Sequence, residues 1–129
     1  MKRSILVVDD QWVVQDLVRT ILTGQGHAVR QACTAQDALR QAREADLDLV
    51  ILDAHLPGGN GWELLPIFRA EFPARPVIML TGDAPAEQWR RLFAHDPSAP
   101  FEILEKPFQV WLFEETVSRA LEERDRLSA

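Results

Sequence analysis

Apolar residues along this chain follow two different spacings. Short, mostly apolar runs occupy residues 5–8, 49–52, 77–80 and 101–104, and a weaker one lies near residues 28–32. Between these runs, apolar residues recur at intervals of three and four positions. Short continuous runs are typical of buried parallel strands, whereas the second spacing is typical of amphipathic helices. The pattern predicts strands that alternate with helices five times, and therefore an α/β fold.

Each predicted helix is expected to turn one apolar face toward the sheet. In chain order, these faces consist of Val14, Leu17, Val18 and Ile21; Ala38, Leu39 and Ala42; Leu64, Leu65, Phe68 and Phe72; Trp89, Leu92 and Phe93; and Val110, Phe113, Val117, Ala120 and Leu121. Gly24 and Gly26 are expected to stop the first helix. Thr34, with Asp37 three residues later, predicts where the second helix begins.

Composition and charge narrow the class of protein. The 129 residues fit a single domain, 1–129, in which residues 122–129 are expected to be the stub of a linker. A net charge of −6 without a basic run argues against nucleic-acid binding by this chain. The apolar runs are too short to cross a membrane and no secretory pattern is seen, so we expect a cytoplasmic protein. The one cysteine, Cys33, has no partner for a disulfide and is interpreted as a buried or half-buried thiol.

Reactive side chains stand where the predicted strands end. Asp9 and Asp10 follow the first strand, and Asp53 ends the third. Thr81 follows the fourth strand, and Lys106 comes shortly after the fifth. Ligands bind at the carboxyl ends of parallel strands, so these carboxylates, the hydroxyl and the ammonium are expected to form one site.

Each of these residues has a plainer interpretation when it is taken alone. Asp10 can cap a helix, and Asp53 can belong to a turn after a buried strand. Thr81 can be an ordinary strand residue and Lys106 an ordinary exposed lysine. The combination favours chemistry, because adjacent buried carboxylates repel each other and a divalent cation relieves that repulsion.

The group fits a phosphoryl transfer to an aspartate. In this interpretation Asp53 is the nucleophile, the Thr81 hydroxyl donates to a phosphoryl oxygen, and Lys106 supplies a counter-charge. Asp10 would bind Mg²⁺ (or Mn²⁺) directly, and Asp9 would bind it through a water molecule.

Four motifs, taken in order along the chain, resemble a known family. They are Ile5-Leu6-Val7-Val8-Asp9-Asp10, Asp53-Ala54-His55-Leu56-Pro57 with Gly61, Met79-Leu80-Thr81-Gly82, and Lys106-Pro107-Phe108. Over essentially the whole chain, they resemble the receiver domains of two-component response regulators, including the stand-alone chemotaxis regulator.

The resemblance implies both a fold and a role. The fold is a doubly wound, flavodoxin-like (βα)5 sandwich of three layers, whose five parallel strands have the order 2-1-3-4-5. The role is a phosphoacceptor signalling domain, not an enzyme with other substrates, and a histidine kinase or histidine phosphotransfer protein phosphorylates Asp53. The backbone carbonyl of His55 would complete the Mg²⁺ sphere. Phosphorylation would then switch the face made by the fourth helix, fifth strand and fifth helix toward an unknown downstream protein.

The chain departs from the family pattern in its switch region. Ile103 stands at the switch position, where the family often has Tyr or Phe, and residues 96–100 look like an extra loop. His55 and Asp83 match positions beside the path of the hydrolytic water and are expected to tune the phosphoryl lifetime. His55 also fits a plain exposed loop residue.

Two interaction surfaces are expected. The resemblance implies phosphodonor docking at Val14, Gln15, Pro107 and Phe108. The partner-facing surface is expected to carry Trp89 and Trp111, since large aromatic residues often anchor interfaces. We expect a monomer or weak homodimer that does not associate with a membrane.

Two other functions remain open at this point. A pseudo-receiver would use the same fold for protein interaction without phosphorylation, but its usual sign, loss of an acidic residue or of the lysine, is not seen. An aspartyl phosphatase of the haloacid-dehalogenase type would need an Asp-x-Asp motif, whose second acid is replaced here by His55, and a cap domain.

Overall fold

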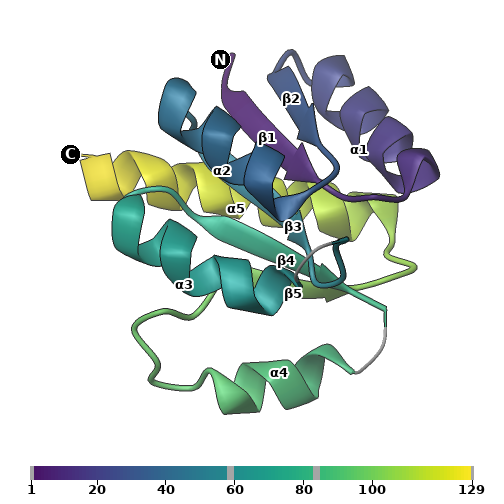
Figure 1. Ribbon diagram of the computed structural model, residues 1–129. Coiled ribbons are helices and arrows are strands. Elements are labelled where there is room, and N and C mark those ends of the chain that lie inside the picture. The colour runs from purple at the N-terminus through teal and green to yellow at the C-terminus, as the bar shows by residue number, and fades with distance from the viewer. Residues whose placement is uncertain (1, 58–59, 83–84, 129) are drawn as a thin grey trace.

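Five strands and five helices alternate along the part of the chain that the structure describes, as the apolar pattern predicts (Figure 1). The computed structural model describes residues 2–57, 60–82 and 85–128. The strands are β1 (Ser4–Val8), β2 (Ala28–Ala32), β3 (Leu49–Asp53), β4 (Val77–Thr81) and β5 (Glu102–Glu105). The helices are α1 (Trp12–Gly24), α2 (Ala35–Glu44), α3 (Gly61–Glu71), α4 (Ala86–Leu92) and α5 (Val110–Ser128). All neighbouring strands pair in parallel, in the order β2-β1-β3-β4-β5, which confirms the expected sheet.

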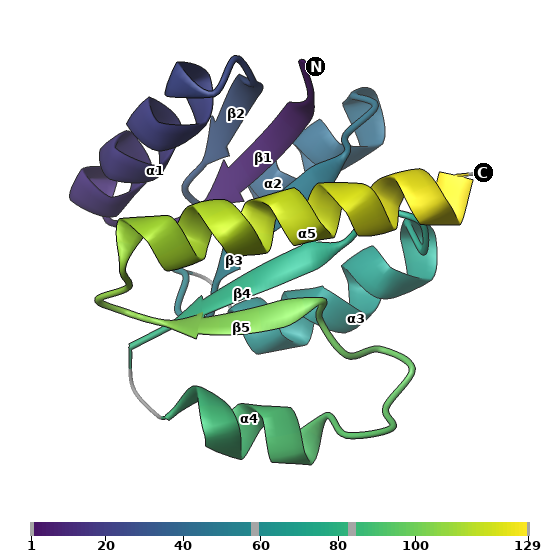
Figure 2. The ribbon, with the colours of Figure 1, turned by 180° about the vertical axis from the view of Figure 1, so that it is seen from behind.

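Helices cover both faces of the sheet, and the two faces have separate cores (Figures 1 and 2). Alternate residues of β1 show the division: Leu6 packs on the side of α2, α3 and α4, whereas Ile5 packs on the side of α1 and α5. Every residue of β3 and β4 is buried. Strands covered on both faces must be apolar throughout, which is why they appear in the sequence as continuous runs.

Local signals set where the helices begin and end. The Thr34 side chain accepts a hydrogen bond from the Asp37 amide at the start of α2, and Gly26 follows α1 with a positive φ of 90°. Gly61, at the start of α3, lies against the backbone of β3. A Cβ atom at this position would come within 2.1 Å of the Asp53 carbonyl oxygen, so only glycine fits there.

Four predictions about burial are wrong. Leu17 and Val110 are each 45% exposed and Leu92 is 71% exposed, so none of the three belongs to the inner face of its helix. The buried face of α1 consists of Gln15, Val18 and Leu22, because Gln15 finds hydrogen-bond partners inside. Cys33 is exposed, at the point where β2 has ended.

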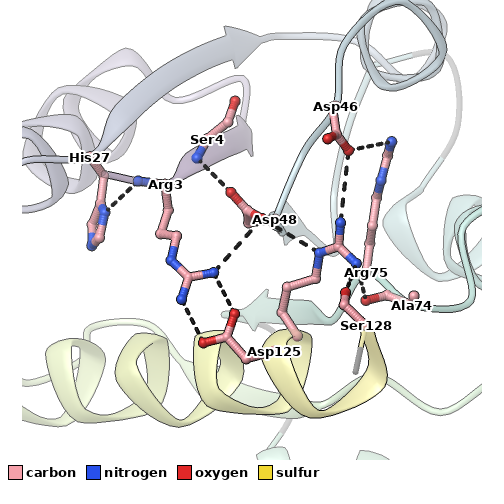
Figure 3. A network of polar contacts seen from close by, with 10 residues as sticks. Arg3, Ser4, His27, Asp46, Asp48, Ala74, Arg75, Asp125 and Ser128 are labelled. Atoms are coloured by element: carbon pink, nitrogen blue, oxygen red, sulfur yellow. Dashed lines mark hydrogen bonds and ion pairs between the residues drawn. The ribbon is translucent and has the colours of Figure 1, made fainter. Parts of the chain in front are cut away.

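Residues 122–128, expected to be a linker stub, form the last turns of α5. They are held at the amino ends of the strands by a network of charged side chains, which we call the amino-end network: Arg3, Asp46, Asp48, Arg75, Arg124 and Asp125 (Figure 3). Among the described residues, no helix combines the length and the apolar character needed to cross a membrane.

Asp48 is at the centre of the amino-end network. Its carboxylate accepts the Ser4 amide at 3.0 Å and lies 3.5 Å from Nε of Arg124. Arg3 donates two hydrogen bonds, of 2.7 and 2.6 Å, to Asp125 of α5 (Figure 3). The network therefore ties β1, β3 and the end of α5 together on the side of the sheet opposite the strands' carboxyl ends.

Candidate functional site

The carboxyl ends of four strands bring the predicted site residues to one edge of the sheet. Asp53 and Thr81 are the last residues of β3 and β4, and Asp9 directly follows β1. Asp9 and Thr81 are fully buried, and Asp53 is only 4% exposed. The Lys106 amide donates to the Thr81 carbonyl at 2.8 Å, which places this lysine beside them.

The ammonium of Lys106 lies among acidic and amide oxygens. Its Nζ is 2.9 Å from Oδ2 of Asp9 and 3.4 Å from Oδ1 of Asp53. Oε1 of Gln11 accepts from the same Nζ at 3.1 Å, and the Gln11 amide donates to Oδ1 of Asp9 at 2.8 Å. Sequence reasoning missed Gln11, since a glutamine that follows two aspartates gives no signal of its own.

Negative charge exceeds positive charge at this edge. Carboxylate oxygens of Asp9, Asp10 and Asp53 all lie within 4.8 Å of one another, and Lys106 is the cation in contact with Asp9 and Asp53. Burial and the neighbouring Asp9 charge raise the pKa of Asp53 to about 6, although Lys106 acts in the opposite direction. Clustered carboxylate oxygens with an uncompensated charge are the donor set that a hard divalent cation requires.

The capping interpretation of Asp10 does not hold. The residue at the N-cap of α1 is Gln11, and its side chain makes no capping hydrogen bond. Asp10 is exposed beside the buried Asp9, so its carboxylate is open to a ligand.

The expected docking residues divide into two groups. Pro107 and Phe108, with Val14 and Leu17 of α1, line a groove of about 420 Å³ next to Lys106. Gln15 does not belong to this surface. It is 6% exposed, and its Nε2 donates to the carbonyls of Asp9 and Ala32, so it offers no side chain to a docking partner.

The two tryptophans expected on the partner-facing surface differ in exposure. Trp111 is 61% exposed at the start of α5, whereas Trp89 is half-buried and stacks on Trp62 of α3 with ring centroids 4.0 Å apart. Of the two tryptophans expected on the partner-facing surface, Trp111 is therefore the more exposed. Phe93 extends the stack, with its ring centroid 5.5 Å from that of Trp62. Trp12, at the start of α1, is 76% exposed.

Two of the remaining predicted residues, His55 and Ile103, are among those that the structure describes. His55 is exposed and its amide donates to Oδ1 of Asp53 at 3.3 Å. Ile103 is 2% exposed in the core that faces α3 and α4. Asp83, expected to tune the phosphoryl lifetime, lies outside the described residues.

Known proteins resemble this chain in sequence and in fold. The sequence matches the response regulator receiver domain family over residues 5–117. The chain belongs to this family. Among curated relatives, this receiver is 34% identical to the nitrogen assimilation regulatory protein NtrX of Azorhizobium caulinodans over 124 residues, which are 95% of the chain and 27% of that protein. It is 36% identical to the KDP operon transcriptional regulatory protein KdpE of Escherichia coli over 107 residues, or 83% of the chain and 46% of that protein.

Solved receiver structures superimpose over nearly the whole chain. A CheY-like receiver domain protein from Methanospirillum hungatei has a TM-score of 0.86 at 28% identity and covers 98% of each chain. The receiver domain of NtrX from Brucella abortus has a TM-score of 0.79 at 34% identity, covering 92% of this chain and 98% of that one. The receiver spans less than half the length of the NtrX and KdpE relatives named above.

Proposed function

We propose that Asp53 of this receiver accepts a phosphoryl group from a histidine kinase or a histidine phosphotransfer protein. The observation that carries the proposal is the meeting of buried Asp53 with Lys106, Asp9 and Asp10 at one edge of the sheet. None of the acidic or lysine residues is lost, so the interaction-only pseudo-receiver has no specific support. The reaction is expected to take place in the cytoplasm.

The site residues fit distinct parts of this reaction. A carboxylate oxygen of Asp53 attacks phosphorus while the bond from phosphorus to the donor's imidazole nitrogen breaks, and the electron pair of that bond stays with the nitrogen. With a pKa of about 6, Asp53 is mostly ionised at neutral pH and can act as the nucleophile. The Lys106 ammonium, 3.4 Å from Asp53, would neutralise charge on the phosphoryl oxygens, and the Thr81 hydroxyl would donate to one of them.

The acidic residues fit the role of cation ligands. We assign Asp10 and Asp53 as direct ligands of Mg²⁺ (or Mn²⁺), Asp9 as a ligand through water, and the backbone carbonyl of His55 as a further ligand. When bound, the cation supplies positive charge that offsets the charge of the incoming phosphoryl group. The cation could bind to these residues and to water before a phosphodonor arrives.

The output of the receiver is proposed to be a change at the face formed by α4, β5 and α5. Two contacts support a connection through this face: the guanidinium of Arg90 on α4 donates to the Ile103 carbonyl at 2.8 Å, and a Glu105 carboxylate oxygen accepts the Ala86 amide at 2.6 Å. Glu105 directly precedes Lys106, so α4 is linked to the residue next to the site. Trp111 is the exposed aromatic residue of this face that a downstream protein could contact.

Phosphorylation is tested by mass. The protein is incubated with acetyl phosphate with and without Mg²⁺, beside an Asp53→Asn control, and intact mass is recorded. We expect one phosphoryl adduct that needs Mg²⁺ and is absent from the control. An adduct on Asp53→Asn would contradict the assignment of the acceptor. If the wild type takes up no phosphoryl group from acetyl phosphate or from a phosphorylated histidine phosphotransfer protein, the interaction-only function is favoured.

A further inference from the structure

The buried amide of Gln15 lies behind the acidic site. We propose that Gln15 is a positioning residue for the cation-binding carboxylates, a role that rests on the proposed function. Gln15 is on α1 and is 6% exposed. Its Nε2 donates to the Asp9 carbonyl at 2.6 Å and to the Ala32 carbonyl at 2.7 Å, so one side chain joins the ends of β1 and β2.

The backbone hydrogen bonds between β1 and β2 end next to the carbonyl groups that Gln15 contacts. The pairing of β1 with β2 ends at Val8 and Ala32, and one more bond follows, from the Asp9 amide to the Ala32 carbonyl at 3.1 Å. Beyond this point the carbonyl of Asp9 receives its hydrogen bond from the Gln15 side chain. A buried carbonyl needs such a donor, and here the donor comes from a helix instead of the neighbouring strand.

The hydrogen bond to the Asp9 carbonyl fixes more than one atom. The carbonyl of Asp9 and the amide of Asp10 belong to one rigid peptide plane. Holding the oxygen fixes the rotation of this plane, and the plane sets the direction in which the chain reaches the Cα atom of Asp10. Gln15 therefore sets where the exposed Asp10 carboxylate stands relative to the buried Asp9.

Other groups hold the Asp9 side chain itself. Its Oδ1 accepts the Gln11 amide, and its Oδ2 accepts from Lys106. Gln15 acts on the main chain, so its contribution to the geometry is separate from theirs. Groups that hold metal ligands in place change metal affinity without touching the metal, commonly by about 10- to 100-fold.

A second glutamine provides a matched control. Gln41, on α2, is 9% exposed, and its Nε2 donates to the Gln31 carbonyl at 2.7 Å and to Asp37 at 3.0 Å. Like Gln15, it is a nearly buried helical glutamine that satisfies a carbonyl of β2. These two partners of the Gln41 amide, however, include none of the three clustered aspartates.

The experiment compares Gln15→Met with Gln41→Met. Methionine has a similar length and no amide, so each substitution removes the donor and leaves the volume nearly unchanged. Mn²⁺ affinity is measured by electron paramagnetic resonance without phosphodonor, and the urea midpoint is measured without cation. We expect both variants to have lower midpoints, but only Gln15→Met to bind Mn²⁺ more weakly, by about tenfold or more.

Several outcomes separate the possibilities. Equal weakening of Mn²⁺ binding in both variants, or none in Gln15→Met, would show that Gln15 only stabilises the fold, and the proposed function would stand. Absence of Mn²⁺ binding to the wild type, or binding that survives Asp53→Asn and Asp10→Asn unchanged, would overturn the cation site and this role together. If Gln15→Met does not fold, Gln15→Asn replaces it. This variant keeps an amide on a shorter side chain that cannot reach both carbonyls, so weakened Mn²⁺ binding is again expected, and unchanged binding would again refute the role.

Discussion

The two ends of the sheet carry similar charged groups arranged in opposite ways. At the carboxyl ends, Asp9, Asp10 and Asp53 form a cluster in which the Lys106 ammonium contacts Asp9 and Asp53. At the amino ends, the carboxylates of Asp46, Asp48 and Asp125 are matched by the guanidinium groups of Arg3, Arg75 and Arg124. One end is left with excess negative charge, and the other is balanced.

The pKa values of the carboxyl groups show the physical consequence. Burial and the charge of Asp9 raise the pKa of Asp53 to about 6, so ionisation of Asp53 is less favourable in the folded protein than in water. A hydrogen bond from Arg3 lowers the pKa of Asp125, so its ionised form is favoured. An unbalanced cluster costs stability and is open to a cation or a phosphoryl group, whereas a balanced cluster stabilises the fold.

The largest effect is expected from breaking the balanced end. Asp48→Ala removes the acceptor of the Ser4 amide and leaves Arg3 and Arg124 without a carboxylate that both of them contact. Because one partner of a partly buried charged network is lost, we expect the free energy of unfolding to fall by about 2–3 kcal/mol. Urea denaturation measures it. Asp46→Ala is the control, because the Asp46 side chain is 89% exposed. If Asp46→Ala lowered the free energy of unfolding as much as Asp48→Ala does, the central role of Asp48 would be contradicted.

A smaller effect of opposite sign is expected at the unbalanced end. The pKa of Asp53 in the folded protein, about 6, is above the ordinary value of 3.8, so the wild type loses stability as pH rises through this interval. Asp53→Asn does not ionise and avoids this loss. We expect it to be more stable than the wild type at pH 7.5 without Mg²⁺, by about 1–2 kcal/mol, and the gain to disappear near pH 4.

Urea midpoints of both proteins across pH 4 to 8 measure the gain, and Mg²⁺ should reduce it because the cation stabilises only the protein that binds it. Asp10→Asn is the comparison at the same edge. Asp10 is exposed, so its substitution should stabilise less than Asp53→Asn. A gain that did not change with pH would show that ionisation of Asp53 is not its source.

The smallest effect is expected at the outer part of the balanced end. The carboxylate of Asp125 receives two hydrogen bonds from Arg3, but it is 57% exposed, so water and salt screen the pair. Asp125→Asn should lower the thermal midpoint less than Asp48→Ala does, and the difference from the wild type should shrink further at high salt. A loss independent of salt would show that packing, and not charge, gives Asp125 its effect.

The sequence predicted the sheet well for a physical reason. Strands β3 and β4 are buried on both faces, so they must be continuously apolar, and parallel strands place their last residues at the same edge. The meeting of Asp9, Asp53, Thr81 and Lys106 follows from these two facts. The buried faces of the helices were harder to predict, since Leu17, Leu92 and Val110 match the helical spacing and yet are exposed.

Contacts made by single polar side chains could not be predicted in the same way. Gln15 was expected on a docking surface, and only the fold shows its amide between two buried carbonyls. The amino-end network joins Arg3 to Asp125, residues at opposite ends of the chain, and no local pattern connects them. Periodicity carries information about burial, whereas the partner of a charged or amide group depends on the tertiary arrangement.

The stack of Trp62 on Trp89 has an optical consequence. Excited states of two indole rings mix when their centroids are as close as 4.0 Å, so the circular dichroism of the tryptophan bands depends on their separation and on the 22° between their planes. Trp62 directly follows the glycine that lies on the Asp53 carbonyl, and Trp89 belongs to α4. A change in the distance between α3 and α4 should therefore change the circular dichroism of the tryptophan bands. This signal can be measured in solution without an attached dye.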